Sequence, residues 1–316
     1  MSDQTKSFHH YVPQFLLKYF SDNGMVWVYD RKTNEYRFQS VRSTTGAKGF
    51  YTFNFKSGNK TDEIEKLFTQ IEGNAVEVIK SITLEKKTLD PKEKSDLAMF
   101  VAGMYLRSPE SIENTKKGIE MMTKELMSRI HQNKEYHDHV WDELVKKGDI
   151  PKESKGKEKT RQTFIKKNYD IIVPKEHALA IMVKMLLDLY KYMVQMDWKI
   201  LIAPPKKAYI ISDKPAYTIN INPTPDFFGH SLGLFAPNCE TFCVLTPKVA
   251  IYLSQKHNPD GSDIYEAKEE FVDFLNRATA ITCHRFLVSH NNPLLKKWVD
   301  KVKLKQRGLY HQVKVD

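Results

Sequence analysis

The sequence predicts an α+β protein in which an N-terminal β-hairpin and a helical bundle pack with a mainly antiparallel C-terminal sheet. Apolar residues recur at three- and four-residue spacing from about 61 to 145, whereas short apolar runs separated by Pro-containing turns follow residue 196. A hydrophobic fraction of 41% supports a buried core. We expect an N-terminal region over 1–145, a basic linker or loop over 146–170, a helix and sheet over 171–303 and a basic tail over 304–316, or one structural domain overall.

The N-terminal segment is expected to hold a short helix and a hairpin. Pro13 suits the first position of a helix that runs to Phe20 and holds His9 and His10 at its mouth. Strands are predicted over 26–29 and 36–38 as a hairpin, with another over 50–55. Long helices follow over 61–82 and from Asp90, the expected N-cap, to about residue 107. One further helix is predicted over 109–145.

The second half is expected to alternate helices with paired strands. A helix over 175–196 precedes two apolar runs, 198–203 and 208–212, which we predict to form a hairpin around Pro204 and Pro205. The runs 241–245 and 249–253 repeat this pattern around Pro247. An amphipathic helix spanning about 264–278, a strand over 280–288 and a short helix from Pro293 complete the prediction.

The net charge of +10 is concentrated in two segments. Residues 146–167 carry nine Lys/Arg and three Asp/Glu, and residues 291–316 carry seven and two. Such runs bind the phosphates of nucleic acid, or they are solvated segments that keep a protein in solution. Nucleic acid is therefore an expected partner through the linker and the tail, with solvation as the alternative.

Three cysteines, Cys239, Cys243 and Cys283, fit a reducing compartment. The first residues do not resemble a signal peptide, and the most apolar helix, over 178–196, contains the charged residues Lys184 and Asp188. We therefore expect a cytoplasmic protein with no membrane partner. Its oligomeric state stays open.

The order of several short motifs is similar to a known family. His10-Tyr11-Val12-Pro13-Gln14 is followed by an aromatic-rich helix, then by Arg107-Ser108-Pro109 and by Ser212-Asp213-Lys214-Pro215. This arrangement resembles the bacterial family called domain of unknown function 4238, over nearly the whole chain. The resemblance supports the element boundaries and implies no particular activity.

A metal-free site is predicted from residues of these motifs. The imidazole of His10 would transfer a proton, Asp213 would orient it, Arg107 would hold a phosphate, and Glu72 would join from the first long helix. Further binding residues are expected at five positions: His9, Tyr11, Gln14, Ser212 and Lys214. The alternatives are a histidine bonded to a loop carbonyl, an aspartate that stabilises a turn, and an arginine that complements a helix dipole.

No motif indicates a metal or cofactor. His131, Glu135 and His139 stand at four-residue steps, yet they span about two helical turns, so a solvated helix face is the simpler interpretation. Cys239 and Cys243 are interpreted as core or loop thiols, because no second ligand pair stands near them. Walker, Rossmann and Gly-x-Ser-x-Gly motifs are absent from the sequence.

Three functional classes follow from these features. The first is a nucleic-acid-directed effector or nuclease, of a defence or toxin-like kind, that uses the His/Arg/Asp site. The second is a non-catalytic interaction module that binds protein through the Tyr- and Phe-rich N-terminal region. The third is a small-molecule enzyme with a pocket between the helical half and the sheet.

Overall fold

The fold was determined as a computed structural model that describes residues 8–54, 60–152, 155–220, 239–257 and 262–304. Its strands, in chain order, are β1 (Phe8–His10), β2 (Met25–Asp30), β3 (Glu35–Ser40), β4 (Gly46–Lys48), β5 (Phe53–Asn54), β6 (Lys60–Thr61), β7 (Met196–Ile202), β8 (Ile211–Ser212), β9 (Ala216–Asn220), β10 (Cys239–Val244), β11 (Val249–His257), β12 (Ser262–Glu266) and β13 (Phe286–Ser289). Its helices are α1 (Gln14–Lys18), the 3₁₀ turn η1 (Val41–Ser43), α2 (Glu63–Glu85), α3 (Pro91–Leu106), α4 (Pro109–Gln132), α5 (Lys134–Lys147), α6 (Lys157–Ile165), α7 (Lys175–Gln195), α8 (Glu269–Thr282) and α9 (Asn292–Lys301).

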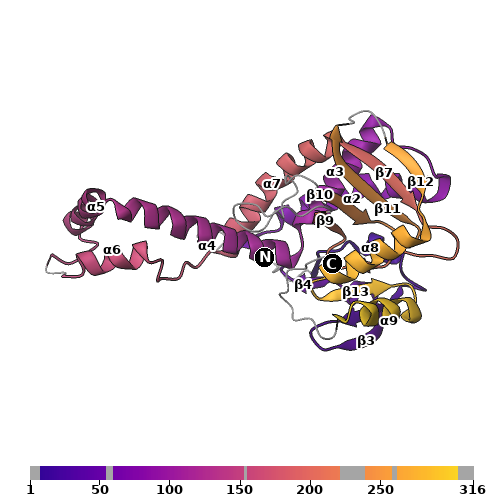
Figure 1. The fold of residues 1–316 in the computed structure, drawn as a ribbon, viewed down its shortest axis with the longest axis horizontal. Helices are drawn as coiled ribbons and strands as arrows, with labels where there is room; N and C mark the ends of the chain where they lie inside the picture. Colours follow the sequence, from indigo (N-terminus) through magenta and orange to yellow (C-terminus); the bar gives the residue numbers. More distant parts are fainter. Residues whose placement is uncertain (1–7, 55–59, 153–154, 221–238, 258–261, 305–316) are drawn as a thin grey trace. The chain divides into compact units, whose positions relative to one another are not determined.

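The chain forms two compact units, which we describe separately. Unit 1 consists of residues 1–111 and 182–316, and unit 2 of residues 112–181. The α+β class is confirmed, with helices and antiparallel strands along the chain (Figure 1). The boundaries expected at 145 and 171 both fall within unit 2.

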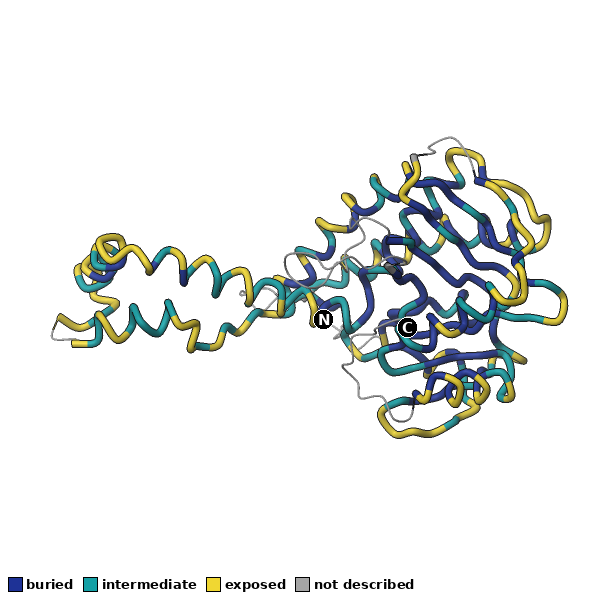
Figure 2. Tube along the Cα trace, viewed as in Figure 1, coloured by how far each residue is buried: buried dark blue, intermediate teal, exposed yellow. Residues whose placement is uncertain are grey.

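Unit 1 contains a five-stranded sheet in the order β12-β7-β11-β10-β9 and a four-stranded sheet in the order β3-β2-β13-β8. All pairings in these sheets are antiparallel except that of β12 with β7. The two-stranded sheets β1-β4 and β5-β6 are also antiparallel. The strands of the five-stranded sheet lie largely in the buried interior (Figure 2).

Helix α8 contacts both larger sheets and so connects them. On one side, the Asn276 amide accepts a hydrogen bond from the Ile210 N–H at 2.8 Å and donates one to the Ala208 carbonyl at 2.8 Å. On the other side, the Tyr217 hydroxyl of β9 lies 2.9 Å from Thr279 Oγ1. A buried cluster around Trp298 of α9 covers β13 and β2. The polar contacts of Asn276 fix the segment that leads into β8.

Local sequence explains where several elements begin. Asp90 accepts a hydrogen bond from the Glu93 N–H at 2.8 Å, and the Glu93 carboxylate accepts one from the Asp90 N–H. A capping box with Asp90 as the predicted N-cap therefore starts α3. The β2–β3 hairpin and the β10–β11 hairpin are also confirmed. In the first, Asn34 adopts φ 56° in the turn and accepts the Tyr29 hydroxyl at 2.8 Å.

Other predictions of secondary structure were wrong. Residues 198–203 and 208–212 do not pair, because β7 and β8 belong to different sheets. The helix expected over 109–145 is interrupted at Asn133, whose side chain caps α5. Part of the expected 146–170 loop is helix α6. Ile264 lies in β12 rather than in a helix, and residues 280–282 extend α8 rather than beginning a strand.

The N-terminal stretch also differs from expectation. His9 and His10 lie in β1, paired with Ala47 and Gly46, so they are strand residues before the helix. Of the strand expected over 50–55, residues 53 and 54 form β5, and residue 55 lies outside the described residues. Pro13 serves as the N-cap of α1.

Candidate functional site

The two N-terminal histidines bond to main-chain groups. The Nδ1 of His9 accepts a hydrogen bond from the Tyr51 N–H at 2.8 Å, and its Nε2 lies 3.9 Å from the Asp62 carboxylate. The Nε2 of His10 bonds to the Arg42 carbonyl at 3.0 Å, and its Nδ1 lies 3.5 Å from the Gln14 amide. Burial is the main cause that lowers the pKa of His10. The geometry of His10 matches the alternative of a histidine bonded to a loop carbonyl.

Arg107 is the centre of a buried cluster at the end of α3. Its side chain is 1% exposed and lies 2.6 Å from the Glu72 carboxylate. The guanidinium also donates to the His10 carbonyl and lies 4.7 Å from the centre of the Phe68 ring. The Tyr51 hydroxyl donates to the Arg107 carbonyl at 2.7 Å. Arg107 is therefore bonded to Glu72 and to the backbone of His10, and its guanidinium group faces other protein groups.

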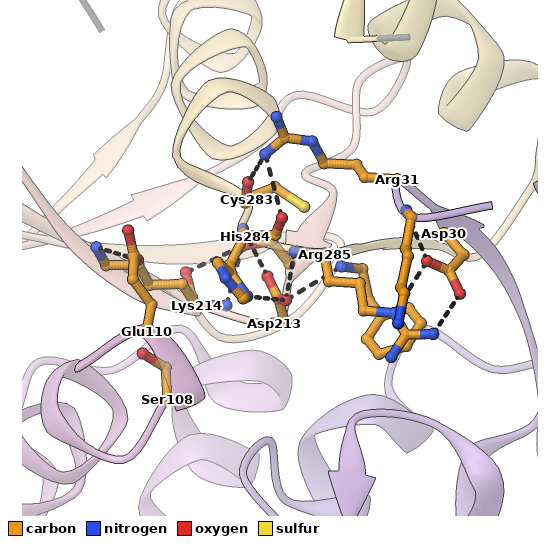
Figure 3. Close-up of polar contacts among 12 residues, drawn as sticks. Asp30, Arg31, Ser108, Glu110, Asp213, Lys214, Cys283, His284 and Arg285 are labelled. Atoms are coloured by element: carbon orange, nitrogen blue, oxygen red, sulfur yellow. Dashed lines mark hydrogen bonds and ion pairs between the residues drawn. The ribbon is translucent and has the colours of Figure 1, made fainter. Parts of the chain in front are cut away.

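Asp213 follows β8 and is fully buried. Its carboxylate accepts three main-chain hydrogen bonds, from the N–H groups of His284 at 3.0 Å, Arg285 at 2.7 Å and Phe286 at 3.1 Å (Figure 3). No hydrogen bond or ion pair joins it to His10, Arg107 or Glu72 in the described part of the chain. The predicted carboxylate is thus not bonded directly to the predicted imidazole or guanidinium.

The neighbours of Asp213 in the Ser-Asp-x-Pro motif have local roles. Ser212 Oγ accepts a hydrogen bond from the Lys214 N–H at 3.1 Å and also contacts the Lys214 carbonyl at 3.0 Å. The Lys214 ammonium lies 2.9 Å from Glu110. Tyr11 is buried, and its pKa is raised by burial and then by the charge of Asp213. Tyr11 therefore lies within electrostatic reach of this carboxylate.

His284 places a second type of group beside Asp213. Its Nδ1 lies 4.0 Å from the Asp213 carboxylate, which is ion-pair distance, and its side chain is 24% exposed. No described residue forms a hydrogen bond with the Nε2 of His284. A buried carboxylate at this distance from one nitrogen of a partly exposed imidazole helps to orient the ring. Burial raises the pKa of the Asp213 carboxyl, while His284 and the three N–H groups act in the opposite direction.

Arg285 adds a cation next to this pair. Its guanidinium makes a bidentate ion pair with Asp30, at 3.0 Å and 2.9 Å, and stacks over the Phe286 ring at 4.4 Å. The side chain is nevertheless 39% exposed. Figure 3 shows Lys214 and Glu110 on one side of Asp213, and Arg285 and Asp30 on the other. We call the Asp213–His284 pair, together with the neighbouring cations Arg285 and Lys214, the dyad site.

A second arginine fixes the turn that carries His284. Arg31 donates to the carbonyl of Cys283 and to that of His284, the latter at 3.2 Å (Figure 3). The turn is therefore held by Asp213 through its N–H groups and by Arg31 through its carbonyls. This double attachment positions the His284 ring without using the side chain itself.

Sequence analysis did not single out His284, Arg285 or Glu65. The first two were assigned to the interior of a strand over 280–288, although β13 begins only at Phe286. Glu65 lies three residues before Phe68 and seven before Glu72, on the face of α2 that meets Arg107. One of its carboxylate oxygens is buried without a hydrogen-bond partner among the residues that the structure describes, and burial raises the pKa of Glu65 to about 7. In the sequence, only the spacing of Glu65 from Phe68 and Glu72 could have indicated that it lies on this face.

The remaining candidates are structural. His131 is in α4, whereas Glu135 and His139 are in α5, and His131 pairs with His137 instead. Cys239 and Cys243 are buried, as expected for core thiols.

Among the described residues, no group of three or more His, Cys, Asp or Glu side chains is placed to hold a metal ion. None of the helices in the described ranges has the length and apolarity to cross a bilayer.

These observations define an α+β protein with two open-edged sheets joined by a helix and a buried carboxylate beside a partly exposed histidine. The chain belongs to the family described as "Protein of unknown function (DUF4238)", whose model matches residues 9–293. This confirms the family suggested by the motifs. The comparison with curated proteins and the comparison with solved structures each gave no match.

Proposed function

We propose that this protein is a nucleic-acid-directed phosphodiesterase whose proton-transfer group is His284. The proposal rests on the pairing of the buried Asp213 carboxylate with the partly exposed His284 imidazole at 4.0 Å. Asp213 keeps the role predicted from sequence, while His284 takes the role assigned to His10 and Arg285 the role assigned to Arg107. The proposed site thus keeps a carboxylate, an imidazole and a guanidinium, but the imidazole comes from His284 and the guanidinium from Arg285.

In the proposed reaction, His284 Nε2 removes a proton from the attacking oxygen, either of water or of a ribose 2′-hydroxyl. This oxygen bonds to phosphorus while the P–O bond to the leaving oxygen breaks, and the leaving oxygen takes up a proton from solvent. The imidazolium that results is stabilised by the Asp213 carboxylate, which acts as a positioning residue. Arg285 and Lys214 offset the negative charge that develops on the phosphate oxygens. Their carboxylate partners, Asp30 and Glu110, hold the two cations in place.

The charge of unit 1 supports an anionic substrate. Unit 2 carries fifteen Lys/Arg against twelve Asp/Glu, so most of the net charge of +10 belongs to unit 1. Within unit 2, several cations of the 146–167 segment pair with carboxylates, such as Lys157 with Asp142 at 2.8 Å. The proposal therefore places phosphate contacts at the dyad site rather than in this segment.

The interaction-module alternative has less support. It relied on the aromatic residues of the N-terminal region. Of these, Tyr11, Phe20, Tyr29 and Tyr51 are buried in unit 1, whereas Phe8 and Phe38 are exposed. Buried rings stabilise the fold and are not available to a partner.

The test compares His284→Gln with the wild-type protein on labelled single-stranded RNA, single-stranded DNA and duplex DNA, with and without EDTA. We expect the wild-type protein to cleave at least one substrate and the variant to lose at least 100-fold in kcat/KM, because general acid–base groups contribute about 10²–10⁴-fold. Asp213→Asn should lower kcat more than it changes KM, because the imidazolium that forms during the reaction loses its carboxylate partner.

His139→Gln is the matched control, since His139 is exposed on α5 and lies outside the dyad site. Circular dichroism of each variant establishes that it is folded. Absence of cleavage by the wild-type protein on every substrate, or full activity of folded His284→Gln, would contradict the proposal.

A further inference from the structure

A cavity of about 580 Å³ lies in unit 1, away from the dyad site. It is bounded by α8, by the β7–β8 and β10–β11 connections and by the start of α9, and none of its lining residues belongs to the dyad site. Its polar lining includes Lys206, Lys207, Lys248, Lys297, His290 and Asn291. The volume is within the usual range of small-molecule pockets, about 300–1,000 Å³.

The tautomer of His290 follows from its neighbours. Asn291 Oδ1 caps α9 by accepting the Leu294 N–H at 2.8 Å, so its Nδ2 is the atom that faces His290. That amide lies 2.7 Å from the Nε2 of His290 and donates to it. The proton of a neutral His290 is therefore on Nδ1. This Nδ1–H is buried and has no hydrogen-bond partner among the described residues.

A buried donor without an acceptor costs about 1–3 kcal/mol, so such a group usually meets a ligand or a bound water. The charge around it specifies the kind of acceptor. Lys206 is exposed at the rim, and Lys297 lies 3.7 Å from the Asp273 carboxylate. Lys207 lies 2.9 Å from Asp273 and 3.6 Å from Glu269. The cavity lining thus carries four lysines and one aspartate.

Lys248 shapes the wall of the cavity. Its ammonium donates to the carbonyls of Pro204 at 3.1 Å, Pro205 at 2.9 Å and Lys207 at 2.6 Å. These bonds hold the β7–β8 connection in place and present Lys206 and Lys207 beside the hollow. Burial, and then the nearby Lys248, lower the pKa of His290, which keeps the ring neutral and its Nδ1–H in place near neutral pH.

We propose that this cavity binds a phosphorylated small molecule, with His290 Nδ1–H donating to a phosphate oxygen and Lys206 and Lys297 neutralising its charge. The site goes beyond the proposed phosphodiesterase activity, because it shares no residue with the dyad site. It is a second ligand site in the same unit.

The probe is pyrophosphate, titrated into the full-length protein at low ionic strength by isothermal calorimetry, with citrate as a carboxylate anion for comparison. We expect pyrophosphate to bind the wild-type protein and to bind more tightly than citrate. Lys206→Gln combined with Lys297→Gln should weaken binding at least tenfold, and His290→Leu should do the same.

Lys92→Gln combined with Lys268→Gln is the control for charge, because both lysines are exposed and neither lines the cavity. Thermal melting checks that each variant is folded, and the Lys206/Lys297 pair keeps the test valid if His290→Leu does not fold. Absence of pyrophosphate binding to the wild-type protein, citrate binding of equal strength, or equal loss in the control would overturn the proposal. His284→Gln should bind pyrophosphate normally, which separates this site from the dyad site.

Discussion

Single residues show how burial decides which polar groups are available for chemistry. Arg107 and Asp213 are each about 1% exposed and each bonds to several protein groups. They connect distant parts of unit 1, since Arg107 joins residues 10, 51 and 72, and Asp213 joins β8 to the turn before β13. His284, by contrast, keeps one ring nitrogen without a protein partner in the described ranges. Chemistry is therefore expected at His284 rather than at the two buried charges.

Glu65 provides a residue-scale prediction of pH dependence. Its folded-state pKa of about 7 lies above the ordinary value of 4.5, so the folded protein binds a proton that the unfolded chain releases. Stability should therefore fall as the pH rises from about 4.5 to 7. Glu65→Gln removes this penalty and should stabilise the protein at pH 8 by about 1–2 kcal/mol, a figure reduced for the partial exposure of the side chain.

Urea unfolding at pH 4.5 and pH 8 measures the effect. The variant and the wild-type protein should be nearly equal in stability at the lower pH and should differ at the higher one. Glu63→Gln changes an exposed neighbour on α2 and is the control. Its difference in stability from the wild-type protein should not increase with pH. A constant difference across the range would refute the assignment.

At the scale of elements, the short pair β1-β4 positions the N-terminal motif. A side chain at Gly46 would meet the Phe8 ring at 2.2 Å and the His9 carbonyl at 2.8 Å. The carbonyl belongs to the backbone of the paired strand, so it is not free to move aside. Glycine is therefore required for the close approach of these two strands.

Gly46→Ala should destabilise the protein by about 1–3 kcal/mol, because overpacking forces the backbone to shift. Gly73→Ala in α2 is the matched control, since a Cβ there would meet no atom within 4 Å. That change should be neutral or should stabilise by about 0.5–1 kcal/mol, through helix propensity. Denaturant midpoints of the two variants test the contrast, and equal effects would show that the β1-β4 approach is looser than described.

At the scale of the whole molecule, unit 2 has its own small buried core. His131 Nδ1 and His137 Nδ1 lie 2.8 Å apart, and His137 Nε2 bonds to the Lys157 carbonyl at 3.0 Å. A carbonyl accepts, so His137 carries its proton on Nε2 and accepts from His131 through Nδ1. The His131 ring also stacks on Phe164 at 4.3 Å. Helices α4, α5 and α6 thus meet at two imidazoles that are bonded to each other.

This arrangement predicts that unit 2 loses stability in acid. Burial, and then His137, lower the pKa of His131 below its ordinary 6.5, so the unfolded chain takes up the proton first. The stability of unit 2 should fall as the pH drops below about 6.5. The groups that face the pair include Arg161, which donates to the His131 carbonyl at 3.3 Å and adds positive charge.

Hydrogen exchange of residues 134–147 at pH 7 and pH 5, corrected for intrinsic rates, measures this loss. His131→Gln should remove most of the pH dependence, while His139→Gln on the exposed face of α5 should leave it unchanged. Equal protection of the wild-type segment at both pH values would contradict the prediction.

Patterns that depend on neighbours in sequence were predicted well. The capping box of α3, the apolar spacing of α2 and the turns of the two confirmed hairpins each involve residues a few positions apart. Sheet membership was not predictable in this way. Residues 208–212 resemble the second strand of a hairpin, yet β8 pairs with β13, more than seventy residues later. Contacts over such distances depend on the whole core.

The sequence by itself determined the fold class, the family and Asp213 as a residue of interest. Only the tertiary structure decided that Asp213 meets His284 rather than His10, and that Arg107 is enclosed by protein. The physical reason is that a side chain's burial and partners depend on which distant segments pack around it. Local spacing specifies a helix or a turn, but a site exists only where separate elements converge.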